Sequence, residues 1–259
     1  MDANKKSSIG RFTRLLRLTT QEFVKERKNV ALLLFGLAYF AYYQTRQLSE
    51  DLQKIAADSI IFSSSVTERL QVYVLTHFPN TFWIIDWITS LLYVFAFTFV
   101  LASLLLTMIT TGREAWRYGL AWLVCGLAQF SLQILFPVLV PIRSSKDIRP
   151  IRKEIWPSSE KLVGMKYGGI PSGHFGYSIF GILLTRRINY RRMNILYMLN
   201  TIIFPLIVLY LGEHYIVDLV VSMILFPIIY FVTLRVIEHF VGEAKYPTVF
   251  EIAQKSELH

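Results

Sequence analysis

Residues 81–109 have the sequence TFWIIDWITSLLYVFAFTFVLASLLLTMI, in which Asp86 is the one charged residue. A helix needs about 20 apolar residues to cross a bilayer, so this stretch predicts a membrane-spanning helix that is long enough to tilt. The whole chain agrees with this prediction, because 54% of its 259 residues are hydrophobic, 17% are charged and the mean hydropathy is +0.44. Soluble domains carry about 25% charged residues. The composition therefore excludes a typical soluble enzyme, a disordered chain and a disulfide scaffold.

Apolar runs of similar character recur along the chain, separated by polar and charged patches, and they predict five further spans. The polar stretch 44–80 predicts a helix at the membrane interface, and residues 141–170, which are rich in Pro, Gly and cations, predict a loop. The predicted fold is thus an all-α polytopic membrane protein with six transmembrane helices. The six predicted spans are residues 29–43, 81–109, 116–140, 171–185, 195–211 and 215–236.

The N-terminal residues 1–28 carry eight Lys and Arg residues, with Arg11, Arg14 and Arg17 at helical spacing. Apolar residues lie between these cations, so the segment predicts a basic amphipathic helix on a membrane surface. The chain is accordingly divided into this segment, a six-helix membrane catalytic domain (29–240) and a cytoplasmic tail (241–259). The single cysteine, Cys125, lies inside an apolar run and is expected to serve helix packing.

The distribution of Lys and Arg predicts the orientation of this integral, multi-pass protein. Alternate loops place 17 of these residues on the side of the termini and 10 on the other side, and cytoplasmic loops carry the excess. The termini are therefore predicted to be cytoplasmic, and residues 141–170 extracytoplasmic or lumenal. Seven outer cations lie in 141–170 against the general rule, so we expect a function for them. The net charge is +9; because the cations flank apolar runs, the expected partners are membrane lipids and not nucleic acid.

Three groups of charged or reactive residues fall on this outer side. Ionisable groups at the ends of spans are costly and by default mark functional sites. The groups are the loop cations Arg143, Lys146 and Arg149; the stretch Pro171-Ser172-Gly173-His174 at the start of the fourth span; and Gly212-Glu213-His214-Tyr215-Ile216-Val217-Asp218 at the start of the sixth.

The Pro-Ser-Gly-His stretch predicts an anion site at the start of a helix. Proline suits the first helical turn, and Gly173 lets a ligand approach the backbone closely. The free N–H groups of that turn and the helix dipole attract phosphate, and His174 would stand beside it. Taken alone, the stretch also fits a simple helix cap.

His214 and Asp218 are four residues apart and therefore share one face of a helix. A carboxylate in that position holds one imidazole nitrogen protonated and leaves the other free as a nucleophile or base. Taken alone, the pair also fits a structural ion pair. Two histidines, one carboxylate and several cations together suit phosphoryl transfer. No third ligand for a metal is evident beside them, so the sequence predicts neither a metal nor a cofactor.

These residues resemble the type 2 phosphatidic acid phosphatase superfamily of membrane lipid phosphatases and phosphotransferases, over roughly residues 80–240. The family pattern is Lys-x6-Arg-Pro, Pro-Ser-Gly-His and Ser-Arg-x5-His-x3-Asp, and the chain has Arg149-Pro150, all of 171–174, and His214-x3-Asp218. The resemblance implies that His214 forms a phosphohistidine, Asp218 orients it and His174 protonates the leaving group. It also implies that Arg149, Ser172 and Gly173 bind the phosphate and that no metal is needed.

The chain departs from the family pattern at two places. Ile142 stands where the family has the first Lys, and a charge from Arg143 or Lys146 would replace it. Ile207 and Val208 stand where the family has Ser-Arg. The cations that could replace this arginine are Arg152, Lys153 and Lys166.

The leading hypothesis is a metal-independent phosphatase that acts on a phospholipid or isoprenoid phosphate or diphosphate at the outer face. The alternative is a lipid headgroup phosphotransferase, because residues 212–219 also resemble the His-Tyr-x-x-Asp element of inositol phosphorylceramide and sphingomyelin synthases. A third hypothesis, from another class, is a non-catalytic lipid-binding or transport scaffold. The missing Ser-Arg favours the scaffold, whereas the two intact histidines oppose it.

Overall fold

The structure is a computed structural model that describes residues 17, 18, 20–47, 62–136, 138–157 and 170–244. These residues are 82% helical and contain no strand, which confirms the all-α fold. The helices, in chain order, are α2 (Arg27–Gln47), α4 (Ser65–His77), α5 (Phe82–Ile109), the 3-10 helix η2 (Gly112–Glu114), α6 (Ala115–Leu135), α7 (Pro141–Ser144), α8 (Ile151–Ile155), α10 (Gly173–Arg187), α11 (Arg191–Leu211) and α12 (Ile216–Val241).

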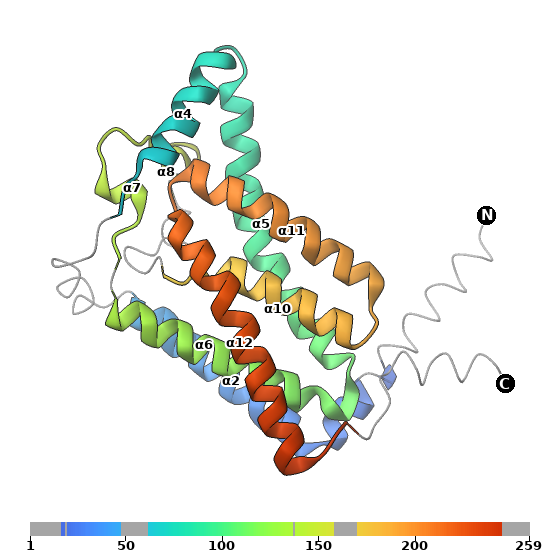
Figure 1. The fold of residues 1–259 in the computed structure, drawn as a ribbon. Coiled ribbons are helices and arrows are strands. Elements are labelled where there is room, and N and C mark those ends of the chain that lie inside the picture. Colours follow the sequence, from blue (N-terminus) through green and yellow to red (C-terminus); the bar gives the residue numbers. More distant parts are fainter. Residues whose placement is uncertain (1–16, 19, 48–61, 137, 158–169, 245–259) are drawn as a thin grey trace, which may run out of the picture.

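Six long helices occupy the positions of the six predicted spans (Figure 1). Within the described ranges, α5, α11 and α12 are long and apolar enough to cross a membrane. Large apolar side chains are exposed along all three, as a lipid environment requires. The chain is therefore a membrane protein, and the count of six crossings stays a prediction. Examples of these exposed side chains are Leu91, Phe95, Leu106, Ile202, Leu206, Met223, Ile224 and Phe231.

The predicted loop 141–170 contains two short helices, so its assignment as wholly irregular was wrong. Pro141 lies in the first turn of α7, where a proline ring fits and its missing N–H costs nothing. Pro150 likewise precedes α8 as its N-cap. The third predicted span was too long at its end, since α6 stops at Leu135, two residues before Pro137, and proline cannot continue a helical hydrogen-bond ladder.

Two apolar clusters hold the long helices together. The first joins α5, α6, α10, α11 and α12 around Leu104, Phe180, Phe226 and Tyr230. The second joins α5, α8, α10 and α11, with one residue of α12, and it includes Tyr93, Phe175, Phe204 and Val208. Figure 1 shows α10 between α11 and α12, and the start of α10 beside the start of α12. The second cluster includes Phe175 near the start of α10 and Leu219 near the start of α12.

Several predicted features lie outside the described residues. Most of the predicted amphipathic helix in 1–28 is among them, as are most of the predicted tail and Lys166. Residues 20–25 of the N-terminal segment are helical, and α4 is helical within the predicted interfacial stretch 44–80.

Candidate active site

A tight turn between α11 and α12 presents Glu213 and His214. Gly212 ends α11 with φ of +72°, a left-handed conformation that glycine adopts without strain. A Cβ there would also press on Ile142 and Ile148 at 3.2–3.3 Å. The N–H of Glu213 then donates to the carbonyl of Val208 at 2.9 Å. The turn therefore fixes the direction in which His214 leaves the helix.

His214 is held from both ring nitrogens. Its Nδ1 is 3.0 Å from Asp218 Oδ2, and its Nε2 is 3.1 Å from the Ser172 hydroxyl. The same carboxylate oxygen accepts the N–H of Tyr215 at 2.8 Å. His214 is 6% exposed, and Asp218 and Ser172 are fully buried. Because a carboxylate accepts, the proton lies on Nδ1, and Nε2 carries the lone pair that faces Ser172.

The starts of α10 and α12 are tied together by the backbone as well. The N–H of Ser172 donates to the carbonyl of Asp218 at 3.3 Å, and the Ser222 hydroxyl donates to the carbonyl of Ser172 at 3.0 Å. The sequence motifs 171–174 and 212–218 are thus brought into one site. Their contact joins residues 42 positions apart.

Gly173 is the first residue of α10 and lies against α6. A Cβ at this position would overlap the amide group of Gln129, and the neighbouring Gln133 donates to the carbonyl of Pro171 at 3.3 Å. The absence of a side chain therefore lets α6 approach the start of α10 closely.

His174 lies one residue further along α10, between two aromatic rings. The ring centroids of Tyr93 and Phe204 are 5.7 and 5.6 Å from its own. His174 is close enough to His214 and Arg152 to interact with both electrostatically. The two histidines predicted to act together therefore share one site.

Arg152 and Glu213 form a buried ion pair next to the histidines. Arg152 Nε donates to Glu213 Oε1 at 2.8 Å, and both side chains are 6% exposed. The guanidinium also lies over the ring of Tyr93, 5.3 Å from its centroid. The pair borders a cavity of about 300 Å³ that is lined by Ile142, Arg143, Pro150, Arg152, Lys153 and Glu213.

The loop cations named from the sequence have different surroundings. Arg143 lines this cavity, whereas Lys146 is exposed and does not. Arg149 Nη2 pairs with Asp86 at 3.1 Å and Glu154 at 2.8 Å. Partial burial lowers the pKa of Arg149, but the bond to Glu154 and the charge of Asp86 outweigh it, so its pKa lies above the ordinary value.

The two departures from the family pattern lie in different surroundings. Ile142 lines the cationic cavity, so the cavity keeps cations although this position is apolar. Ile207 and Val208 are buried in the second apolar cluster. Of the two possible substitutes that the structure describes, Arg152 and Lys153, Arg152 is the one that interacts with His174. No local spacing could have paired it with Glu213, which is 61 positions away.

A second, more apolar cavity of about 170 Å³ lies on His214 itself. Its walls come from the chain before α4, from α4, and from the α11–α12 turn, and they include Phe62, Val66, Leu209 and Tyr215. In the part of the chain that the structure describes, no group of three or more His, Cys, Asp or Glu residues is placed to hold a metal ion.

Comparison with known proteins gives one result that bears on this site. No curated protein and no solved structure matched the chain. The sequence model of one family matches residues 68–232, a range that begins inside α4 and contains both histidines, Asp218 and the cationic loop. Since this range covers well over half of the chain, the protein belongs to the PAP2 superfamily, the type 2 phosphatidic acid phosphatases and their relatives.

Proposed function

We propose that this protein is a metal-independent lipid phosphate or diphosphate phosphatase that works through a phosphohistidine on His214. One observation carries the proposal: Asp218 holds Nδ1 of His214, so its Nε2 lone pair points toward the start of α10. Membership of the PAP2 superfamily supports a lipid enzyme of the phosphatase or phosphotransferase type.

In the first step, the phosphoryl group lies against the N-terminal N–H groups of α10, where the helix dipole favours an anion. Arg143, Arg152 and Lys153 add positive charge from the neighbouring cavity. The substrate displaces the Ser172 hydroxyl from Nε2, and the nitrogen attacks phosphorus. The N–P bond forms as the bond to the lipid oxygen breaks, and His174 gives its proton to that oxygen.

In the second step, water attacks the phosphohistidine. His174, now neutral, accepts the proton from this water, so its role reverses between the steps. The P–N bond breaks, inorganic phosphate leaves, and Nε2 regains its lone pair. Asp218 stabilises the positive charge on the imidazole while the N–P bond exists.

The surroundings of His214 support a lipid phosphate as the substrate. The site opens on one side to a cationic cavity and on the other to an apolar one. A phosphate group suits the first and the proximal part of a lipid chain suits the second. The expected substrates are therefore phospholipids or isoprenoid phosphates that enter from the membrane.

The apolar cavity on His214 also favours a second candidate, a lipid headgroup phosphotransferase. His214 would again bond to phosphorus, with diacylglycerol as the leaving group and the headgroup still on phosphorus, and an alcohol bound in that cavity would then attack phosphorus in place of water. The two candidates differ in the donor and in the acceptor, so each is tested with its own substrates.

The experiment measures phosphate release by the purified full-length chain in detergent with EDTA present. The substrates are phosphatidic acid, lysophosphatidic acid and a polyprenyl diphosphate. We expect release from at least one of them and none above background for His214→Ala. The matched control is His77→Ala, since His77 is exposed on α4 and contacts only local groups.

Full activity of His214→Ala would refute the proposal. Phosphate release that needs a divalent metal would also refute it. If none of the three substrates releases phosphate, but a headgroup is transferred from an inositol phospholipid to an alcohol acceptor, the protein is the phosphotransferase.

A further inference from the structure

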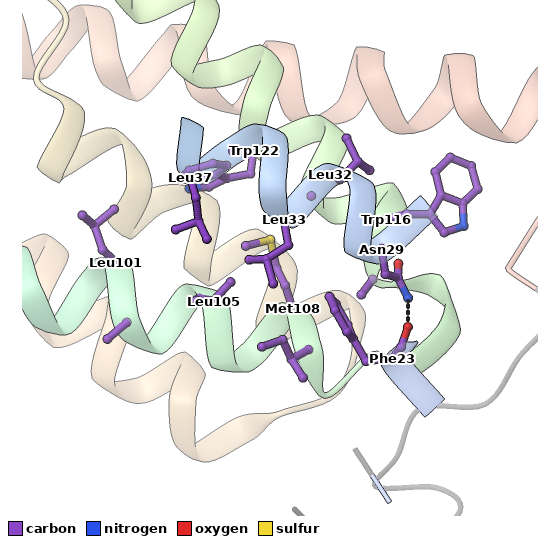
Figure 2. A pocket seen from close by; sticks show the side chains of 15 residues that line it. Phe23, Asn29, Leu32, Leu33, Leu37, Leu101, Leu105, Met108, Trp116 and Trp122 are labelled. Atoms are coloured by element: carbon purple, nitrogen blue, oxygen red, sulfur yellow. Dashed lines mark hydrogen bonds between the residues drawn. The ribbon is translucent and has the colours of Figure 1, made fainter. Parts of the chain in front are cut away.

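A third cavity lies between α2, α5 and the first half of α6, away from the histidines. It has a volume of about 250 Å³ and an almost wholly apolar lining. Figure 2 shows its lining residues, which recur at helical spacing on all three helices. Asn29, Leu33 and Leu37 on α2 span about 12 Å along the helix at 1.5 Å per residue. The cavity is thus an elongated slot.

The end of the slot beside η2 is marked by Asn29, which is 1% exposed. Its Nδ2 donates to the carbonyls of Phe23 at 2.9 Å and Gly112 at 3.1 Å. These two acceptors fix the orientation of the amide, because its oxygen could not replace the nitrogen there. The oxygen, Oδ1, is buried and has no hydrogen-bond partner among the described residues.

The far end of the slot carries a second buried polar group in the same condition. Trp122 Nε1 has no acceptor within the described part of the chain. Figure 2 shows Trp122 beside Leu37, at the opposite end from Asn29. A buried polar group left without a partner destabilises the folded chain. The unpartnered acceptor on Asn29, at one end of an apolar cavity, indicates an occupant that carries a hydrogen-bond donor.

The charges near Asn29 favour a neutral occupant. Arg113 pairs with Glu22 at 3.0 Å, and Glu22 also contacts Lys25. Arg117 pairs with Glu114, and Lys28 lies over the ring of Trp116 at 4.8 Å. Glu22 and Glu114 thus pair with three of these four cations, and the fourth, Lys28, lies over an aromatic ring. An anionic headgroup would therefore bring its charge to cations that already have partners.

We propose that this slot binds a neutral lipid alcohol, with one acyl chain along the apolar walls and its hydroxyl donating to Asn29 Oδ1. A hydroxyl fits because Oδ1 can only accept, whereas a fully esterified lipid or a quaternary ammonium group has no N–H or O–H proton to donate.

This site is separate from the candidate active site and does not depend on its function. Both sites contact α5, which carries Tyr93 beside His174 and Leu105 in the slot. Twelve residues of helix put about 18 Å between these two levels. The proposal can therefore hold whichever reaction His214 performs.

The experiment measures how a brominated lipid quenches the tryptophan fluorescence of the full-length chain in detergent. The probe is a diacylglycerol with bromine atoms on one acyl chain, and its matched control is the same lipid with the hydroxyl acetylated. We expect saturable quenching by the diacylglycerol and about tenfold weaker binding of the acetylated lipid, the effect of one lost hydrogen bond. Trp122→Phe identifies the quenched residue, because it should remove most of the signal change.

A second variant tests the slot without disturbing Asn29. Gly119 lines it, and a Cβ there would meet nothing within 4 Å, so Gly119→Leu fills the space without a clash at the backbone. This variant should lose the saturable quenching and keep the thermal midpoint of the parent. Equal quenching by the two lipids on the parent chain, or undiminished quenching of Gly119→Leu, would overturn the proposal and leave only general contact with lipid.

Discussion

At the scale of single residues, the contacts of Asp218 explain why a carboxylate can lie in the first turn of an apolar helix. One of its oxygens takes both the Nδ1–H of His214 and the N–H of Tyr215. A buried carboxylate without partners would instead become protonated or leave the helix end. The His214 imidazole therefore stabilises the buried carboxylate of Asp218, and the carboxylate in turn orients the imidazole.

Replacing Asp218 with Asn should lower kcat by at least about 100-fold, within the range for lost acid–base and orienting groups. The amide can present its NH₂ to His214, which then accepts at Nδ1 and carries its proton on Nε2. The nucleophilic lone pair would thus face the wrong way. Asp147→Asn is the matched control, because Asp147 is exposed in the loop between α7 and α8. Steady-state phosphate release measures both, and equal rates would contradict the orienting role.

Arg152 should have two separable effects, on stability and on phosphate binding. Arg152→Met leaves Glu213 buried without its partner, and breaking a buried pair costs about 3–5 kcal/mol. We expect a lower thermal midpoint and a higher KM. The double variant with Glu213→Gln removes the stranded charge, so it should recover much of the midpoint while KM stays high. Recovery of both would mean that Arg152 serves packing alone.

At the scale of elements, α10 is the helix on which the site depends. It contacts α5, α6, α11 and α12, and small residues face its neighbours. A Cβ on Gly176 would overlap the Phe226 ring of α12, and one on Gly181 would lie 2.6 Å from Tyr197 of α11. These glycines set how closely α11 and α12 approach α10, and with that the distance between Ser172 and His214.

Gly176→Ala should therefore destabilise the protein and reduce its activity. Overpacking a tight contact costs about 1–3 kcal/mol, and the α10–α12 separation must grow to relieve it. Phe226→Leu in the same chain should restore part of the thermal midpoint. Gly119→Ala, where the added methyl group meets open space, is the control and should be neutral. An unchanged midpoint for Gly176→Ala would show that the two helices already have room to separate.

At the scale of the whole molecule, the polar site gathers at one end of the bundle. The starts of α10 and α12, the end of α11, and both α7 and α8 meet there (Figure 1). The arginines of the α10–α11 turn lie at the other end of these helices. If α10 and α11 cross the membrane as predicted, the site and these arginines face opposite compartments.

Labelling with a membrane-impermeant maleimide tests this orientation. Cys125 is the single cysteine and is buried, so the Cys125→Ala variant has no thiol that could react with the maleimide. In sealed vesicles of known orientation, Lys146→Cys should react from the extracytoplasmic side and Arg191→Cys from the cytoplasmic side. Both positions are exposed. The opposite pattern would invert the predicted topology.

The sequence allowed the long helices and the His214–Asp218 contact to be predicted. An apolar run long enough to cross a bilayer has few alternatives to a helix. The contact was predicted from helical spacing, but His214 lies in the turn before α12, and Asp218 reaches it from the first turn of that helix. The contact of Arg152 with Glu213 and the slot beside Asn29 could not be predicted, since each depends on helices that are distant in the sequence. The short helices α7 and α8 were not predicted, because their proline-rich sequence also fits an irregular loop.

The shared carboxylate has a further consequence for how the protein is made. A chain entering the membrane brings Asp218 in the last long helix, after every other element of the site has been synthesised. An ionised side chain at that depth is costly until it is paired, and both partners of the carboxylate, His214 and the N–H of Tyr215, lie in the turn that precedes α12. The carboxylate is therefore paired as soon as this turn and the start of α12 fold together, and the contact of His214 with Ser172 then completes the site. Cellular quality control would then degrade variants that break these contacts, so their activity must be expressed per molecule of folded protein.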